Sequence, residues 1–544
     1  MAGKKFLHFG AIAFAAAYVL SLLLNLGLQQ LMAEEPRRAT ISIEMLLSEN
    51  YFHSTLLGYE YYNKPPLFNW ILIGLIKLFG STNEFVMRLP SVTSIIILGI
   101  THYFFVRKNF TTKHLASYSA FMLITFADVY LYGIWNGAEI DIFFALVSFL
   151  QIAFLLSYAM GSLKGFWAFT GAYIMMAAGI LTKGLPSVVF MFTTLIVVWW
   201  YTKNFTSIFN LSHLAGILLF FGLAFLFFYG FDDHRKAGLL ISNLLFEATS
   251  KTGLGNNVQN IWVSIATYPL LLAKALLPWS LVLLVLFKTK VPFFKDRKIG
   301  LIALVFLLNI PLYWFTGTPK LRYIYPLLPF IAILFTHIVQ TFYSNNGYHL
   351  TKKYIVKTLL AIAVTIAVAA LGAGFWLGYY WVTGLVLVFL LSIINYIKAP
   401  QTTFTITKPV VALTLIIIAA RLVFAGIVIP YGSQHPKINY KETMRVADSA
   451  TAHNAFKFYG KYLAKKIQPI PYINMVDTLY ETKPMSYQIP YYYYKQFGKT
   501  LQFTDSLNAG GYYIAEIGDV PLNADTLLRF KKITYGNDMM LFKY

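Results

Sequence analysis

Residues 61–90 read YYNKPPLFNWILIGLIKLFGSTNEFVMRLP, and this stretch organises the rest of the chain. It opens with a Lys-Pro-Pro turn at 64–66, continues as an apolar run to Gly80, and ends in a charged segment, 83–90. The carboxylate pair Glu34–Glu35 lies upstream, directly after the first very apolar segment. A charged, proline-containing loop between two apolar segments indicates a site at a membrane surface rather than a simple anchor.

The composition is that of a polytopic membrane protein. Of the 544 residues, 58% are hydrophobic and 12% are charged, and the mean hydropathy is +0.61, well outside the range of soluble domains. The net charge of +22 comes largely from Lys and Arg in short loops between apolar segments, which is typical of cytoplasmic loops that face anionic lipid. No basic stripe interleaved with aromatic residues occurs, which argues against nucleic-acid binding. The chain has no cysteine, which excludes disulfide and thiolate chemistry.

A membrane span needs about 20 apolar residues, and thirteen segments qualify. The first follows Lys4–Lys5 and does not end in an A-x-A-like cleavage site, so we expect a retained helix rather than a cleaved signal. The predicted spans are 6–28, 87–106, 115–133, 138–158, 166–182, 185–201, 211–230, 261–287, 299–316, 322–343, 355–376, 380–397 and 409–430.

Basic residues predict how these spans are oriented. They mark every second connection, which places the N-terminus in the cytoplasm, and an odd number of spans then places the C-terminal segment outside. The outer side contains the long loops 29–86 and 231–260 and most of the acidic residues. The basic residues in question are Lys4, Lys5, Arg107, Lys108, Lys113, Lys164, Lys203, Lys288, Lys290, Lys295, Arg297, Lys298, Lys352, Lys353, Lys398 and Lys408.

Residues 432–544 are polar and tyrosine-rich, and they are long enough for a small domain. We therefore expect a membrane domain over 1–431 and an α+β domain outside the membrane over 432–544. A helix is predicted at 441–466 and a hairpin turn at 535–538. Short strands are predicted at 472–476, 501–504, 512–517, 530–534 and 539–542.

Glu34 and Glu35 are the first candidates for chemistry. They can simply begin a solvated loop. A carboxylate held at a membrane face can instead act as a general base, or orient an acceptor or a metal ion. Arg37 and Arg38, in the Pro-Arg-Arg that follows, supply cations able to hold a phosphate.

Glu139 and Asp141 form a second acidic group, at the outer start of the fourth predicted span. Placing a carboxylate at the edge of a bilayer costs free energy unless the group is paired with a cation, is hydrated, or takes part in catalysis or binding. Carboxylates at a helix N-terminus also complement the helix dipole, which is the structural alternative. The pattern favours a functional role for these two carboxylates. It favours Asp141 more than Glu139, because Asp141 lies deeper in the apolar run.

Four cations lie at the outer ends of apolar runs, namely Lys64, Lys183, Lys320 and Arg322. Lysines there often only extend their ammonium group to water. Lys and Arg normally concentrate in cytoplasmic loops, so several cations on the outer side call for a different explanation. Binding of an anionic ligand such as a lipid phosphate is the simplest one. Arg421, inside the last predicted span, is either part of a buried pair or a further phosphate contact.

The second outer loop contains possible metal donors at Asp232, Asp233 and His234, although adjacent residues rarely all bind one ion. The chain has no P-loop, G-x-G-x-x-G, H-E-x-x-H or G-x-S-x-G motif. Nucleotide hydrolysis and serine-type catalysis therefore have no support.

Taken in order, these motifs resemble those of the GT-C membrane glycosyltransferases, in the branch of the lipid A aminoarabinose transferases and the protein O-mannosyltransferases. The resemblance covers about residues 1–430, and thirteen helices with an outward C-terminal domain also match the aminoarabinose transferases. The motifs are the carboxylate pair, Asn63–Leu67, Leu78–Gly80 with Asn83–Phe85 and Arg88–Ser91, Leu181–Gly184, Leu277–Trp279 and Lys320–Pro329.

The resemblance implies a polyprenyl-phosphate-linked sugar as donor and catalysis at the outer face of the membrane. It implies that the acidic pair Glu34 and Glu35 lies at the catalytic centre and that Asp141 is the acidic residue opening the fourth span. The matching donor-phosphate contacts are Lys64, Lys183, Lys320 and Arg322, and Arg37 is expected to help. Supporting positions are Glu139, Asn63, Glu84, Arg88 and Arg421.

One departure from the family concerns metal binding. In the aminoarabinose enzymes a Glu before Lys-Pro-Pro helps to hold a metal ion, and the corresponding residue here is Asn63, a poorer ligand. A divalent metal therefore stays open as a cofactor.

The sequence as a whole predicts an all-α polytopic GT-C glycosyltransferase of the inner (plasma) membrane, with its active face and its α+β domain extracytoplasmic. The expected acceptor is a lipid such as lipid A, or a protein. Two alternatives stay open: an O-antigen-ligase-like glycan transferase, distinguished by the length of the donor, and a polyprenyl-linked lipid flippase or transporter, which would more often show internal repeats.

Overall fold

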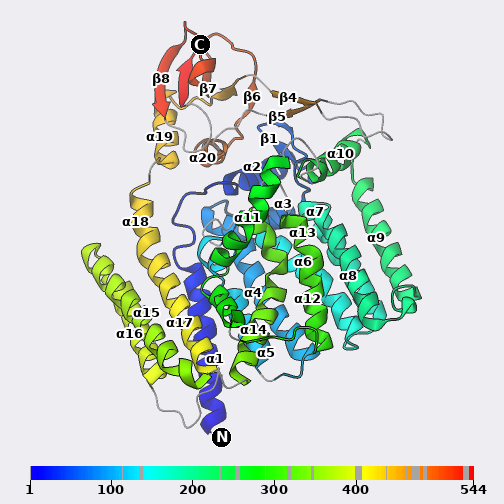
Figure 1. The fold of residues 1–544 in the computed structure, drawn as a ribbon. Helices are drawn as coiled ribbons and strands as arrows, with labels where there is room; N and C mark the ends of the chain where they lie inside the picture. Colours follow the sequence, from blue (N-terminus) through cyan, green and yellow to red (C-terminus); the bar gives the residue numbers. More distant parts are fainter. Residues whose placement is uncertain are drawn as a thin grey trace.

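The computed structural model describes most of the chain, and Figure 1 shows a helical bundle with a small sheet domain at one end. The two termini lie at opposite ends of the molecule (Figure 1). The described residues are 2–112, 114–133, 139–231, 234–251, 258–287, 289–314, 320–344, 348–398, 407–436, 438–460, 463–466, 478–481, 487–530 and 538–544.

The bundle is built from long apolar helices, which satisfy their own backbone hydrogen bonds within the bilayer. Among the described residues, nine helices are long and apolar enough to cross a membrane, or ten if the bent pair Ile265–Ala275 and Trp279–Phe287 is one span. The helices of the bundle are α1 (Ala2–Leu23), α4 (Glu84–Asn109), α5 (Leu115–Ile124), α6 (Ile140–Ala159), α7 (Gly165–Lys183), α8 (Pro186–Thr202), α9 (Leu211–Tyr229), α11 (Val258–Ala275), α12 (Arg297–Asn309), α13 (Pro311–Trp314), α14 (Leu328–Ser344), α15 (Tyr348–Trp376), α16 (Tyr380–Lys398), α17 (Thr407–Val423) and α18 (Ile429–Gln434).

This arrangement confirms the predicted multi-pass membrane protein. Each of the thirteen predicted spans contains helical residues, but 6–28, 115–133 and 185–201 hold helices shorter than a full crossing among the described residues. A count of thirteen crossings therefore stays a prediction.

The loop 29–86 is itself folded and forms a layer between the bundle and the sheet domain (Figure 1). It contains the helices α2 (Glu35–Ser48) and α3 (Leu67–Phe79) and a small hairpin of β1 (Thr55–Leu56) and β2 (Tyr59–Glu60). The second outer loop contributes α10 (His234–Lys251), so Asp232 and Asp233 and the side chain of His234 lie outside the described residues.

The hairpin is held to α2 by one buried carboxylate. Glu44 accepts hydrogen bonds from Thr55 Oγ1 (2.7 Å), Leu57 N (2.7 Å) and Gly58 N (3.2 Å). These three donors offset part of the cost of burying the charge, although burial still raises the pKa of Glu44. The chain that leads to Lys64 is thereby fixed against α2.

The C-terminal part is α+β, as predicted. Its main sheet has the order β6-β3-β7-β9-β8, with β3 parallel to β6 and β7 and with β9 antiparallel to β7 and β8. The elements are α19 (Tyr440–Ala450), β3 (Lys457–Tyr459), β4 (Leu463–Lys466), β5 (Thr478–Glu481), α20 (Gln488–Phe497), β6 (Phe503–Thr504), β7 (Tyr512–Glu516), β8 (Asp525–Phe530) and β9 (Met539–Lys543), with β4 and β5 forming a separate ribbon.

Several details of this part differ from the sequence prediction. The helix expected at 441–466 ends at Ala450, because Ala452 and His453 adopt left-handed backbone conformations that stop it, and strands follow. The strands at 512–517 and 539–542 are confirmed, and β6 covers half of 501–504. Strand β8 ends at Phe530, the first residue of the strand predicted at 530–534, and 531–534 lie outside the described residues. The strand at 472–476 and the turn residues 535–537 lie outside the described residues.

One hydrophobic core joins the C-terminal part to the outer loop. It contains Ile41 of α2 and Phe68 of α3 together with Met444 of α19 and Tyr491 of α20, all of which are buried. The hairpin also meets β6 directly, since Phe503 N donates to Leu57 O at 3.2 Å. A shared core of this kind makes the two parts pack as one unit.

Candidate active site

A cavity of about 510 Å³ opens where the bundle meets the folded outer loop. Its walls come from α2, α6, α7, α8, α10, α13 and the 3₁₀ helix Leu321–Leu327. The lining residues are Glu34, Arg37, Arg38, Tyr61, Asn63, Lys64, Glu139, Ile140, Asp141, Lys183, Leu185, Pro186, Val189, Leu244, Leu312, Tyr313, Lys320, Arg322 and Tyr323.

The start of α2 supplies one wall. Glu34 is the N-cap residue, and Pro36 lies in the first turn, where its missing N–H removes no helical bond. Arg37 lies three residues after Glu34 and forms an ion pair with it. The side chain of Arg37 is 17% exposed and that of Glu34 is 32% exposed. This pair therefore stays accessible from the cavity.

The N-terminus of α6 supplies the opposite wall. Asp141 forms an ion pair with Lys183, and Glu139 forms one with Arg322. Arg322 Nε also lies 3.5 Å from Asp141 Oδ2, so the four groups make one connected network. Buried charges of this kind persist when each is paired, and the pairing holds both cations against the cavity.

Chain geometry explains why these groups meet. Lys183 is the last residue of α7, and Gly184 follows with φ +86°, a conformation that favours glycine. Lys183 Nζ also lies 4.5 Å from the ring centroid of Tyr323 and 5.3 Å from that of Phe144. The ammonium group is thus oriented by ring faces as well as by Asp141.

Glu139 lies just before the membrane-spanning part of α6, and its side chain is 13% exposed. Burial raises the pKa of Glu139 to about 7, and the positive charge of Arg322 opposes that rise. Its charge therefore changes near neutral pH.

Positive charge dominates the cavity. Six of the lining residues are Lys or Arg and three are Asp or Glu, an excess of three positive charges. Lys64 and Lys320 belong to this set, and Lys320 makes no ion pair within the part of the chain that the structure describes. Beside the charges lies an apolar wall that includes Leu185, Val189 and Leu312.

Glu35 does not occupy the position expected of a catalytic carboxylate. It is completely buried, it does not line the cavity, and it pairs with Arg88. The side chains of neighbouring residues on a helix point about 100° apart, so Glu34 faces the cavity while Glu35 faces the bundle. The structure therefore separates the two members of the acidic pair.

Glu84 and Arg421 also lie away from the cavity. Glu84 contacts Lys441 Nζ at 2.9 Å and accepts a hydrogen bond from Tyr492 at 3.1 Å, so it joins α4 to the C-terminal part. Arg421 is buried, donates to Leu131 O at 3.1 Å and lies over the ring of Phe424.

The residues around Asn63 do not fit a metal ion. Asn63 Oδ1 lies 3.5 Å from Asn243 Nδ2, whose other contact is Tyr62 O at 2.8 Å. No group of three His, Asp or Glu side chains that could hold a metal occurs among the described residues.

Sequence reasoning missed several lining residues. No local pattern distinguishes the lining residues Tyr61, Tyr313 and Tyr323 from the many other aromatic residues of the chain. Arg38, predicted with Arg37 as a cation able to hold a phosphate, does line the cavity; it is buried and donates to Tyr61 Oη at 3.2 Å.

A bundle of long apolar helices with a charged cavity beneath an α+β part is the architecture of a polytopic membrane protein. The fold is similar to that of ArnT from Cupriavidus metallidurans bound to undecaprenyl phosphate, with a TM-score of 0.68 and 13% identity over 98% of this chain and 97% of that one. The apo form of the same protein matches with a TM-score of 0.65 and 14% identity, over 100% of this chain and 98% of that one. The predicted GT-C fold is confirmed.

Sequence comparisons agree with this likeness. Residues 63–229 match the model of the dolichyl-phosphate-mannose-protein mannosyltransferase family. An undecaprenyl phosphate-α-4-amino-4-deoxy-L-arabinose arabinosyl transferase of Pseudomonas fluorescens is 24% identical over 66% of this chain and 63% of its own. One from Erwinia tasmaniensis is 33% identical over 24% of this chain and 23% of its own. These matches span less than two thirds of the relatives' length, and they confirm the resemblance to the aminoarabinose transferases.

Proposed function

We propose that this chain is a membrane glycosyltransferase that moves a sugar from a polyprenyl-phosphate donor to an acceptor at the outer face of the membrane. The observation that carries the proposal is the cavity itself, which combines an excess of three positive charges with an apolar wall. A polyprenyl phosphate has a matching anionic head and apolar chain.

The donor phosphate would bind to the cations of the cavity. Lys183 and Arg322 are already held in place by Asp141 and Glu139, and Lys64 lies on the same cavity. Cations fixed before the reaction stabilise charge that develops on a leaving phosphate without having to reorganise. The polyprenyl chain would extend along the apolar wall.

The reaction exchanges one bond for another at the anomeric carbon of the sugar. An acceptor oxygen or nitrogen forms a bond to that carbon, and the bond from the carbon to the phosphate oxygen breaks. The acceptor's proton passes to a carboxylate, and polyprenyl phosphate leaves with the bonding electrons. We assign the proton to Glu34, because it lines the cavity at the start of α2 whereas Glu35 does not.

The acceptor class is drawn from the relatives. The resemblance to the lipid A aminoarabinose transferases favours a lipid acceptor such as lipid A, and the name of the mannosyltransferase family that matches 63–229 favours a protein. We propose the lipid acceptor, because the match to an aminoarabinose transferase extends over 66% of this chain, more than the match to the mannosyltransferase family. We also propose an inner-membrane location with the cavity and residues 432–544 on the periplasmic side, and a membrane domain over 1–431.

Transfer from a panel of undecaprenyl-phosphate monosaccharides tests the proposal. The purified protein in lipid is offered lipid A or a Ser/Thr-rich peptide, with and without chelator, beside Glu34→Gln and Lys183→Ala variants. We expect one donor to be used with lipid A and both variants to lose transfer. Failure to transfer any sugar while undecaprenyl phosphate still binds would overturn the proposal in favour of a longer-glycan ligase or a flippase.

A further inference from the structure

The guanidinium of Arg37 lies close to two tyrosine rings that come from distant parts of the chain. Its Cζ atom is 5.8 Å from the ring centroid of Tyr61 and 5.0 Å from that of Tyr487. Arg37 Nη1 also donates to Tyr487 Oη at 3.4 Å. Tyr61 belongs to the outer loop, whereas Tyr487 is the N-cap residue of α20 in the C-terminal part.

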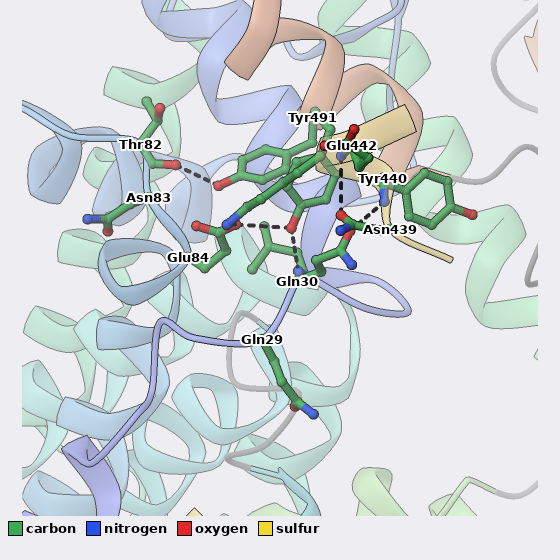
Figure 2. A network of polar contacts seen from close by, with 12 residues as sticks. Gln29, Gln30, Thr82, Asn83, Glu84, Asn439, Tyr440, Glu442 and Tyr491 are labelled. Carbon is green, nitrogen blue, oxygen red and sulfur yellow. Dashed lines mark hydrogen bonds and ion pairs between the residues drawn. The ribbon is translucent and has the colours of Figure 1, made fainter. Parts of the chain in front are cut away.

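Helix α20 has little freedom to move away from this position. Tyr491 donates to Thr82 O at 2.6 Å, as Figure 2 shows. Leu31 N donates to Tyr492 Oη at 2.9 Å, and Tyr492 in turn donates to Glu84. These contacts lie one turn from Tyr487, so its ring is held at a defined place over Arg37.

A second set of contacts fixes α19 beside α20. Gln30 joins the loop before α2 to the start of α19, since Tyr440 N donates to Gln30 Oε1 at 2.8 Å (Figure 2). Gln30 Nε2 donates to Ile438 O at 3.2 Å. The segment 30–37, which leads into the cavity wall, is thus bound to the C-terminal part at both ends.

We propose that Tyr487 is a positioning residue for sugar transfer: its ring fixes the guanidinium of Arg37, and Arg37 in turn fixes the Glu34 carboxylate at the cavity. The C-terminal part therefore completes the active site. Both ring centroids lie within 6 Å of the guanidinium carbon. Arg37 Nη1 donates to Tyr487 Oη, and Arg37 Nη2 pairs with Glu34. The inference rests on the proposed glycosyl transfer.

Steady-state kinetics of Tyr487 variants test this role. In Tyr487→Ala we expect kcat to fall at least tenfold while KM for the undecaprenyl-phosphate sugar changes less than threefold. Tyr487→Phe keeps the ring and should stay within threefold of wild type. Tyr494→Ala, on the same helix but off the cavity, is the matched control for loss of an aromatic ring.

A double variant separates positioning from general stability. If Tyr487 acts through Arg37, the variant Arg37→Ala/Tyr487→Ala should have the kcat of Arg37→Ala alone. Multiplied losses, or a Tyr487→Ala enzyme with wild-type kcat, would overturn the inference even though wild-type transfer is intact. Absence of transfer by the wild type would instead reject the proposed function.

Amide hydrogen exchange supplies a readout that does not depend on turnover. Tyr487→Ala should speed exchange in the first turn of α2, and neither Tyr487→Phe nor Tyr494→Ala should do so. If exchange in the first turn of α2 is unchanged in Tyr487→Ala, Tyr487 does not fix the position of Arg37. This result would refute the inference independently of any measured sugar transfer.

Discussion

The guanidinium of Arg88 binds the carboxylate of Glu35 in a bidentate pair, with Nε 2.8 Å from Oε1 and Nη2 2.9 Å from Oε2. Arg88 also donates to the carbonyl oxygens of Leu26 (2.7 Å), Gln29 (3.1 Å) and Gln30 (3.1 Å). Glu35 itself accepts from Met32 N at 2.8 Å. This buried pair joins α4 to the chain that connects the first helix to α2, and so it sets where α2 begins.

We therefore expect Glu35→Ala to lower stability rather than to act on catalysis alone. Removing one member of a buried ion pair leaves the other charged and unpaired, which costs about 3–5 kcal/mol. Thermal unfolding in detergent should show a clearly lower Tm for this variant. The double variant Glu35→Ala/Arg88→Met should recover part of the loss. A Glu35→Ala protein with wild-type Tm and no transfer would instead assign Glu35 to catalysis.

Lys64→Ala should abolish most of the transfer and leave the fold intact. The lysine lines the cavity and is not part of the hydrophobic core. Loss of a preorganised group that stabilises developing charge typically costs about 10²–10³-fold in kcat. Lys77→Ala serves as control, because Lys77 is an exposed lysine of α3 that contacts Tyr51 and does not line the cavity. Normal turnover by a well-folded Lys64→Ala protein would remove Lys64 from the donor site.

Sugar transfer should rise with pH up to neutrality. The pKa of Glu139 is raised to about 7, mainly by burial, and only the ionised carboxylate holds Arg322 as an ion pair. Activity should therefore increase as pH rises through about 7 and then level off. In Glu139→Gln this step should disappear. A step that persists unchanged in Glu139→Gln belongs to another group.

The ionisation of Glu139 also affects the stability of the fold, and a rise in pH lowers this contribution whereas it raises activity. The pKa of Glu139 rises from an ordinary value of 4.5 to about 7 on folding, so between these values the folded protein binds more protons than the unfolded chain. Stability from this group is present below about pH 4.5 and is lost as pH rises to about 7. The Tm of wild type relative to Glu139→Gln should fall across this window. A constant difference would show that Glu139 has no raised pKa.

Glu84→Ala should loosen the C-terminal part. Glu84 is 4% exposed and binds Lys441 and Tyr492, so its removal leaves a buried hydroxyl with fewer partners at a cost of about 1–3 kcal/mol. Amide hydrogen exchange should become faster in α19 and α20. Glu442→Ala removes only an exposed pair with Arg445 and should have a small effect. Equal effects of the two variants would contradict the role of Glu84.

Hydropathy and charge along the chain were enough to predict the membrane class, the order of the helices, the α+β character of residues 432–544, and the kinds of charge that meet at one end of the bundle. Hydropathy and charge are local properties, so each apolar segment and each charged segment end can be read without its neighbours. The cations Lys183 and Arg322 and the carboxylates Glu139 and Asp141 were recognised in this way.

Which of these groups contact one another follows from long-range packing and could not be predicted from the sequence. Glu34 and Glu35 are indistinguishable in sequence, and they were separated by Arg88, which lies 53 residues from Glu35 and binds it. Arg37 meets Tyr487 across 450 residues. Side-chain direction on a helix changes by about 100° per residue, and the face that becomes buried depends on what packs there. Pairings of this kind belong to the fold and not to any local pattern.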